Sequence, residues 1–354
     1  APAFIVDLKA GIRWLRKNRD RIPGDTEKLI TNGTSAGGAL SALAGTSGNS
    51  PLYAAELAAI GAADERDDVF AVSSYCPIHN LENADAAYEW MFCGHDDFST
   101  LRMSVKDGKV VQKGTTGTQT EQQKQISREL KALFPAYLNG LGLKAADGTP
   151  LTLNEEGVGS FLNALKAEVM CAAQKELDTH HTAQALSGIA VAGSEVEQQS
   201  YLTIENGKVV ALDWEGFVTA ITRMKTAPAF DALDMNSPEN EEFGTEEIQR
   251  QHFTAYGQAH DTAGGTLAAP EIIAKMNPLT FLGKADTAKH WHIRHGSYDR
   301  DTALPIPFIL QTALKNQGCS VDFAFPWGLP HSGDYDLNEL FSWIDGLCQK
   351  SRDL

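Results

Sequence analysis

The sequence predicts an α/β fold: a mostly parallel sheet with helices on both faces and a large, mainly helical insertion. Two observations carry this prediction. Short apolar runs alternate with amphipathic helical patterns in residues 1–80 and 284–354, and such alternation produces parallel sheets with right-handed crossovers. Residues 81–283 are polar, rich in glutamine and largely helical in pattern. We therefore expect a core made of the two outer segments, with an inserted lid or cap domain between them.

The composition is that of a globular protein. The chain has 354 residues, 42% of them hydrophobic, and no apolar run approaches the roughly 20 residues that span a bilayer. A formal net charge of −16 argues against nucleic acid or an anionic membrane as a partner. The five cysteines are Cys76, Cys93, Cys171, Cys319 and Cys348. Their odd number and wide spacing indicate neither a disulfide framework nor a zinc site, although Cys319 and Cys348 could pair.

The first 80 residues predict alternating helices and strands. Apolar residues at positions 5, 8, 12 and 15 lie on one face of a helix over residues 4–16. After a turn at residues 23–25, the pattern predicts a strand over 28–32, a helix to about residue 44, a short helix over 52–60 and a strand over 68–75.

The insertion and the C-terminal segment are interpreted in the same way. Helices are expected over residues 121–138, 155–177 and 214–225, with Pro135 kinking the first of them or ending it early. Asp-Gly and Asn-Gly between β-branched residues predict hairpins at 105–111 and 204–210. The last segment predicts a strand over 290–296, a helix over 304–316, a strand over 321–327 and a closing helix over 334–350.

The most informative stretch is residues 29–43, an apolar run that becomes a helix rich in alanine and leucine. Between the two parts lies Gly-x-Ser-x-Gly, centred on Ser35. A serine at a sharp strand-to-helix turn has its hydroxyl lifted clear of the sheet, and the flanking glycines leave room for that turn. The free amides of the new helix point toward the serine. We therefore expect Ser35 to be a nucleophile and the amide of Ala36 to be an oxyanion donor.

A serine nucleophile needs a base and an acid that orients the base. Asp299 follows the strand that ends at residue 296, and His331 follows the strand that ends at residue 327. Their separation, 331 − 299 = 32 residues, leaves room for one helix and one strand. Asp301 and Asp286 compete with Asp299 for the acid role. His290 and His292 share a strand face, but no carboxylate partner is placed beside them, so a metal is not expected.

Four segments carry a family resemblance: residues 32–38 around Ser35, 83–90, 294–303 around Asp299, and 330–336 around His331. They resemble bacterial tannases of the kind found in lactobacilli, and the similarity runs over nearly the whole chain, including the lid. The resemblance implies an α/β-hydrolase fold and hydrolysis of galloyl esters by a Ser35–Asp299–His331 triad. It also places the contacts to the galloyl hydroxyls on Lys225, Glu239 and Asp301.

The chemistry of these three residues agrees with that implication. A galloyl ring presents three adjacent phenolic hydroxyls, and buried hydroxyls need partners; carboxylates accept from them strongly. The ammonium of Lys225 can donate to a phenol oxygen. Glu239 lies in a loop-like run over residues 230–240 that can face a cleft. The alternative is that Lys225 and Glu239 are surface charges of the lid.

The chain opens with the helix that should precede the nucleophile strand. An α/β-hydrolase normally has several strands before that helix, and their loop usually gives the second oxyanion donor. Nothing here supplies this donor. We therefore expect an N-terminal segment to come from a second polypeptide.

Other functions are compatible with these residues. A feruloyl esterase or a general carboxylesterase would use the same triad, and a non-catalytic hydrolase-fold binding protein would keep the fold without the chemistry. No cofactor is required for the serine reaction. The small-molecule partner implied by the resemblance is a phenolic ester. The sequence leaves the compartment open between secreted and cytoplasmic.

Overall fold

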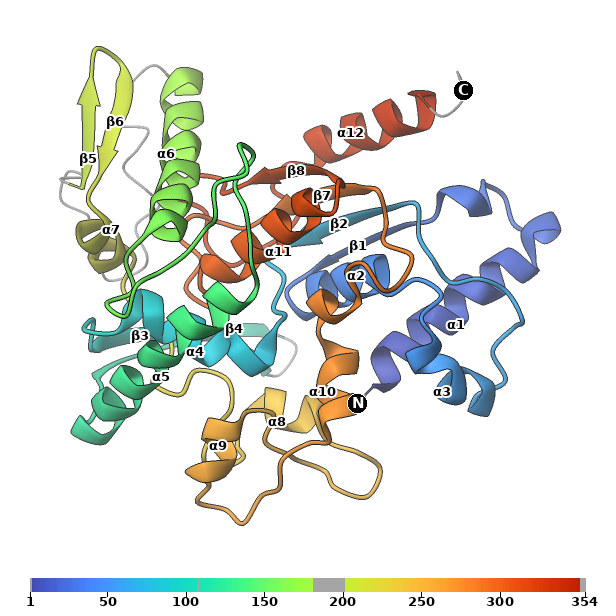
Figure 1. The fold of residues 1–354 in the computed structure, drawn as a ribbon, viewed down its shortest axis with the longest axis horizontal. Coiled ribbons are helices and arrows are strands. Elements are labelled where there is room, and N and C mark those ends of the chain that lie inside the picture. The colour runs from blue at the N-terminus through green and yellow to red at the C-terminus, as the bar shows by residue number, and fades with distance from the viewer. Residues whose placement is uncertain (1, 107–108, 181–200, 351–354) are drawn as a thin grey trace.

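The computed structural model describes residues 2–106, 109–180 and 201–350, and its centre is a four-stranded parallel sheet (Figure 1). The strands are ordered β1 (Ile30–Thr34), β2 (Ala71–Tyr75), β7 (His290–Arg294) and β8 (Ser320–Ala324). Their last residues, from Thr34 through Tyr75 and Arg294 to Ala324, are paired in register. The carboxyl ends therefore form one straight edge, where a parallel sheet places its ligands. This confirms the predicted α/β class.

Helices cover both faces of this sheet (Figure 1). They are α1 (Ala3–Lys17), α2 (Ala36–Thr46), α3 (Ala54–Ala59), α11 (Pro305–Asn316) and α12 (Leu337–Lys350). Trp291 and Ile293 of β7 pack in one apolar cluster with Leu310 of α11. His292, which points to the opposite face, lies 5.6 Å between ring centroids from Trp343 of α12. Alternate residues of one strand thus anchor helices on the two faces.

The core elements differ from the sequence prediction mainly at their ends. The strand predicted over 321–327 stops at Ala324, two residues before Pro326, which has no N–H to continue the ladder. The closing helix begins at Leu337 rather than residue 334. Short 3₁₀ turns lie at Arg19–Arg21, Thr26–Lys28, Pro51–Tyr53 and Pro278–Phe281.

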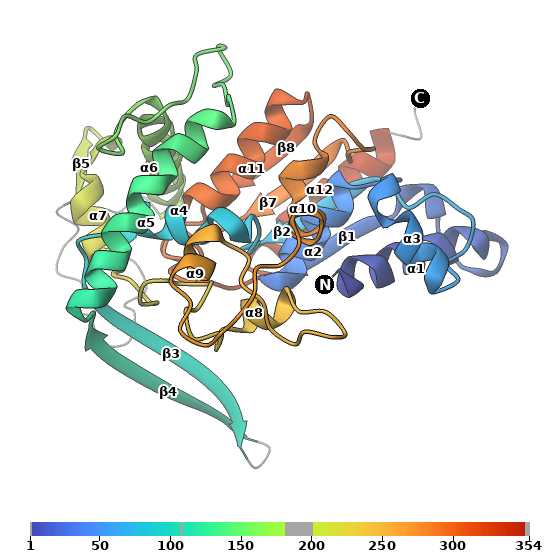
Figure 2. The ribbon, with the colours of Figure 1, turned by 60° about the horizontal axis from the view of Figure 1, so that its bottom comes forward.

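The chain between β2 and β7 carries both predicted hairpins. β3 (Asp97–Lys106) pairs antiparallel with β4 (Lys109–Thr118), and β5 (Leu202–Glu205) pairs with β6 (Lys208–Leu212). The Asp107-Gly108 turn itself lies outside the described residues. Figure 2 shows the β3–β4 hairpin projecting away from the body of the molecule. The helices of this region are α4 (Leu81–Phe92), α5 (Glu121–Gly140), α6 (Ser160–His180), α7 (Trp214–Ile221), α8 (Pro238–Glu242), α9 (Ala255–Ala259) and α10 (Pro270–Met276).

Three helix limits in the insertion depart from the prediction. Pro135 does not end its helix, because α5 continues through the buried proline to Gly140. α6 begins at Ser160 instead of residue 155, since Gly157 and Gly159 take positive φ angles of 82° and 157°. α7 ends at Ile221, where Thr222 has a φ of 57°. The extended chain that follows carries Lys225.

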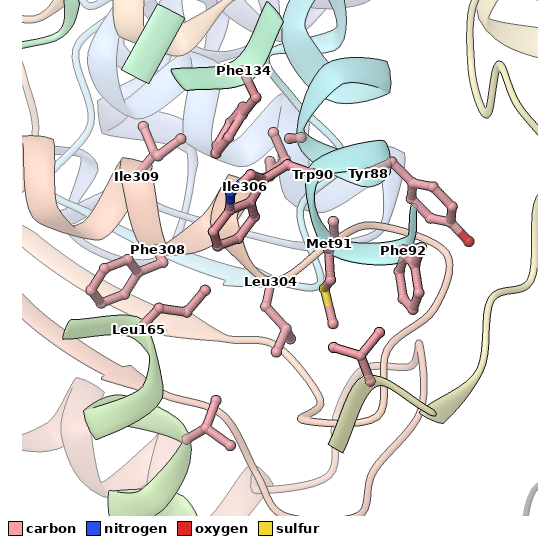
Figure 3. Packing of buried hydrophobic residues seen from close by; sticks show 14 of the residues in the cluster. Tyr88, Trp90, Met91, Phe92, Phe134, Leu165, Leu304, Ile306, Phe308 and Ile309 are labelled. Carbon is pink, nitrogen blue, oxygen red and sulfur yellow. The ribbon is translucent and has the colours of Figure 1, made fainter. Parts of the chain in front are cut away.

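The insertion packs against the core rather than standing apart from it. Figure 3 shows Trp90 of α4 beside Ile306 of α11, with Phe134 of α5 close by. At the other end of the insertion, Tyr53 donates a hydrogen bond of 2.6 Å to the carbonyl of Lys275. Both predicted boundaries therefore cross continuous packing, and the division into core and lid at residues 81 and 283 stays a prediction.

Two further sequence expectations concern surfaces and cysteines. No helix in the described part of the chain has the length and apolarity needed to cross a membrane. No disulfide forms among the described residues, so the possible Cys319–Cys348 pair is not made, and Cys319 is a buried thiol. β1 is an edge strand within the described sheet, and an added N-terminal segment from a second polypeptide stays a prediction.

A buried ion pair fastens the segment after α7 to α4. Arg223 and Glu89 are both fully buried, with 2.6 Å between Nη2 and Oε1. The Arg223 Nε also donates to the carbonyl of Lys225 at 2.7 Å. The pair therefore fixes the backbone that presents Lys225.

We expect Arg223→Leu to lower the free energy of unfolding by about 3–5 kcal/mol, because it leaves Glu89 buried without a counter-charge. Chemical denaturation followed by tryptophan fluorescence measures this. The control is Arg250→Leu, which breaks an exposed pair with Glu241 and should cost less than about 1 kcal/mol. Equal losses in the two variants would mean that the Arg223 pair has no special structural role.

Candidate active site

Ser35 lies at the sharp turn between β1 and α2, with φ 61° and ψ −122°. Such a backbone conformation is strained for a residue with a side chain and clusters at functional sites. A Cβ added to Gly33 would lie 2.3 Å from the carbonyl oxygen of Gly37. The first glycine of Gly-x-Ser-x-Gly is thus a steric requirement of this turn, whereas a Cβ on Gly37 would meet no atom within 4 Å.

The structure brings Ser35, His331 and Asp299 into one hydrogen-bonded chain. The distance from Ser35 Oγ to His331 Nε2 is 2.9 Å, and the distance from His331 Nδ1 to Asp299 Oδ2 is 2.7 Å. Asp299 is fully buried, whereas the side chain of His331 is 24% exposed. With the proton on Nδ1, the imidazole donates to Asp299 and leaves Nε2 free to accept from the serine.

The loops that carry the acid and the base are tied to each other. The Tyr298 amide donates to the carbonyl of Leu329 at 3.0 Å, and the Gly328 amide donates to Ser297 Oγ at 2.8 Å. A Cβ on Gly296 would lie 2.1 Å from the Leu329 oxygen, so only glycine permits this approach. These contacts fix Asp299 relative to His331.

Asp299 is distinguished from its competitors by its partners. Its second oxygen, Oδ1, accepts the backbone amides of Asp301 at 2.8 Å and Thr302 at 3.2 Å. Asp286 instead accepts a hydrogen bond from Asn49, which lies in the loop after α2. Asp301 pairs with Lys225. Of the three carboxylates considered from the sequence, only Asp299 contacts His331.

The electrostatics of the pair favour a charged imidazole. Burial opposes ionisation of Asp299, but His295 and His331 more than offset it and hold the pKa of this carboxyl below its usual range. Burial likewise disfavours the imidazolium of His331, yet the carboxylate of Asp299 raises its pKa above the ordinary value. A proton taken from Ser35 would therefore be held firmly.

Ala36, the expected oxyanion donor, is the first residue of α2. The N–H groups of a helix's first turn have no acceptor within the helix. Ala36 and Ser35 both line one cavity of about 1240 Å³. Ala36 therefore lies beside Ser35 at the cavity wall, and the role of its amide as oxyanion donor stays a prediction.

The three predicted substrate residues line the same cavity as Ser35. Lys225 Nζ lies 2.9 Å from Asp301 Oδ1 and 3.9 Å from the centroid of the Phe230 ring. Burial raises the pKa of Glu239, and the positive charge of Lys225 partly offsets this increase. These residues are partly buried at one wall of the cavity, and their role in binding substrate stays a prediction.

Sequence reasoning did not identify several residues of this cavity, among them Phe230 and Glu242. Glu242 is three positions after Glu239 on α8, and residues at that spacing share a helix face. The run over 230–240, interpreted as a loop, in fact contains the start of α8, which Ser237 caps and Pro238 opens. Burial, then the charge of Glu239, raises the pKa of Glu242 to about 7. Proline after serine was the helix-start signal that could have revealed it.

Buried carboxylates hold the cavity wall in place. Asp85 accepts the backbone amides of Phe230 at 2.8 Å and Asp231 at 3.0 Å. Asp231 in turn accepts from Asn240, next to Glu239, at 2.8 Å. Asp85 therefore acts as a support for the residues that face the cavity.

His292 has a carboxylate partner that the sequence analysis did not place. Its Nε2 lies 3.1 Å from Asp336, and its Nδ1 lies 3.2 Å from Ser73 Oγ. Asp336 also accepts from Arg294 Nε at 2.7 Å. The absence of a carboxylate beside this histidine was thus a wrong inference, because Asp336 reaches β7 from the segment before α12.

Comparisons with known proteins agree with this geometry. A family model described as BD-FAE matches residues 1–124. Tannase from Lactobacillus plantarum superposes with a TM-score of 0.91 and 47% identity, covering 98% of this chain and 72% of that one. A structure titled tannin acyl hydrolase in complex with ethyl gallate superposes with a TM-score of 0.88 and 48% identity, covering 98% and 71%. Esterase LipC of Mycobacterium tuberculosis is 50% identical over 56 residues, which are 16% of this chain and only 14% of LipC.

The triad geometry predicts that a fluorophosphonate will label Ser35. Ser35→Ala should abolish labelling, and Asp299→Asn should slow it by up to about 10⁴-fold, because the base loses its orienting acid. Since Asp299 raises the pKa of His331 and only neutral His331 accepts a proton, Asp299→Asn should also move the acid limb of the labelling rate to lower pH.

Asp301→Asn is the matched control for this experiment. It changes a neighbouring carboxylate that does not contact His331, so the labelling rate and its pH dependence should remain close to those of the parent. Mass spectrometry of the labelled protein gives the rates. A parent protein that takes up no label would favour the non-catalytic binding protein.

Proposed function

Because the chain belongs to the tannase family of α/β-hydrolases, which are carboxylic-ester hydrolases, we propose that it hydrolyses galloyl esters. The substrates are simple gallates and the gallic acid esters of hydrolysable tannins. The observation that carries the proposal is the group of Lys225, Glu239 and Asp301 lining one cavity with Ser35. This cavity has a nucleophile on its wall together with polar groups of both signs.

The proposed reaction passes through an acyl-enzyme. Ser35 attacks the ester carbonyl while His331 takes its proton, and Asp299 holds the imidazole in the required tautomer. The Ala36 amide donates to the oxyanion, a contribution typically worth about 2.7–4 kcal/mol. His331 then gives the proton to the leaving alcohol, and a water activated by the same histidine releases gallate.

Recognition of the galloyl ring rests on its hydroxyls. Glu239 and Asp301 accept hydrogen bonds from phenolic O–H groups, and Lys225 donates to a phenolic oxygen. The flat face of Phe230, already under the Lys225 ammonium, offers an apolar surface for the ring. An acyl group without hydroxyls would leave these buried polar groups without partners, which is the basis of strong discrimination.

The substrate class is tested by comparing methyl gallate with methyl ferulate. We expect a clearly higher kcat/KM for methyl gallate, because the methylated oxygen of ferulate cannot donate a hydrogen bond to a carboxylate. Equal or reversed values in steady-state assays would instead identify a feruloyl esterase or a general carboxylesterase. The triad assignment would survive that outcome.

The residues responsible are tested with the double variant Lys225→Ala plus Glu239→Ala. It should collapse the ratio of kcat/KM for methyl gallate to that for methyl benzoate, mainly by lowering the gallate value. Sites built to bind hydroxyls discriminate by roughly 10⁴–10⁵, so a large part of that range should disappear.

The control is hydrolysis of an activated ester without ring hydroxyls. The double variant should keep most of this activity, because its triad is intact. If the variant retains the parent's gallate preference, Lys225 and Glu239 do not contact the galloyl hydroxyls. The protein is then a general esterase that does not select its acyl group.

A further inference from the structure

Three side chains with metal-binding atoms meet behind the triad. Cys76 directly follows β2, His295 directly follows β7, and Asp299 lies in the loop after β7. One ligand atom from each, sulfur, nitrogen and oxygen, lies within 4.8 Å of the other two, and all three residues are buried. The cluster arises because β2 and β7 are neighbours in the parallel sheet, so that residues distant in sequence leave it at the same edge.

One ring nitrogen of this cluster, Nδ1 of His295, has no hydrogen-bond partner among the described residues. His295 is fully buried, and its Nε2 lies 3.2 Å from the carbonyl of Thr302 and 3.5 Å from Asp299 Oδ2. If Nε2 carries the proton that this carbonyl accepts, Nδ1 presents an unshared electron pair. Among the described residues this Nδ1 has no hydrogen-bond partner, and buried polar groups rarely lack one. A bound cation would satisfy it.

We propose that Cys76, His295 and Asp299 form an inhibitory site for a thiophilic divalent cation, represented by Zn²⁺. A thiolate, an imidazole and a carboxylate are the three ligand types that zinc uses in proteins, at about 2.0–2.3 Å. Those bond lengths require the most distant ligand atoms to approach by about 1 Å. The fourth coordination position is left to water.

Zinc binds a cysteine as the thiolate and releases its proton.

Binding at this site would stop catalysis through Asp299. A divalent cation on its carboxylate cancels the charge that orients His331 and stabilises the imidazolium. Lys225, Glu239 and Asp301 are not touched, so substrate still binds. The expected signature is a lower kcat with an unchanged KM, unlike that of a competitive inhibitor.

The first test is a zinc titration of the activity toward an activated ester without ring hydroxyls, because galloyl hydroxyls bind metal ions themselves. Micromolar zinc should lower kcat, and EDTA should restore it. Cys76→Ala should keep its activity without zinc within a few-fold and need at least ten-fold more zinc for half inhibition. The matched control is Cys171→Ala, which removes an exposed cysteine of α6 and should respond as the parent does.

The second test does not depend on esterase activity, so its result is separable from the proposed function. Equilibrium dialysis should show one zinc ion fewer per chain for Cys76→Ala than for the parent, and no such loss for Cys171→Ala. Cys76→Ser repeats the comparison with a side chain of similar size. The proposal is overturned if the parent is insensitive to zinc, or if the Cys76 variants bind and respond as the parent does.

Discussion

The site depends on one buried carboxylate, that of Asp299. One of its oxygens accepts two backbone amides of its own loop, and the other accepts from His331. A buried charge is tolerated only when such partners satisfy it. The hydrogen bonds that stabilise the Asp299 carboxylate therefore also set the orientation of His331. The loop that carries Asp299 must be folded correctly for the triad to be aligned.

The parallel sheet brings the members of the triad together. Ser35 and His331 are 296 positions apart in the chain, yet β1 and β8 end at the same edge of the sheet, with β2 and β7 between them. The close approach of Gly296 to Leu329 then brings the acid loop against the base loop. The insertion adds the other wall of the cavity, which Asp85 and the buried Arg223–Glu89 pair hold to α4. The triad and Asp301 thus lie on loops at the edge of the sheet, whereas Lys225 and Glu239 lie in the chain between β2 and β7.

The parts of this site that could be predicted from sequence have local signals. The turn at Ser35 needs glycine at position 33, and Asp299 and His331 follow predictable strands. Phe230 and Glu242 were missed because their position depends on Asp85 and on a five-residue helix, α8, rather than on a repeating pattern. The neighbourhood of Cys76 and His295 could not be found from spacing either, since it depends on which strands are adjacent. Of the two effects predicted for Pro135, an early helix end is wrong, because α5 continues to Gly140.

The charged groups of the cavity wall bear on the proposed recognition of a galloyl ring, which is distinct from the serine chemistry. Lys225 is paired with Asp301 before any substrate enters, so its ammonium is not a bare buried charge. Glu239 and Glu242 are both partly buried carboxyls whose pKa values are raised, and a protonated carboxyl can donate as well as accept. A ring with several hydroxyls can therefore enter by exchanging partners with these groups, at little desolvation cost. A ring without hydroxyls would break the contact between Lys225 and Asp301 without forming new hydrogen bonds. The triad would still act on its carbonyl in the same way. The proposed preference for a hydroxylated acyl group thus rests on this wall of the cavity, and the proposed serine chemistry rests on Asp299.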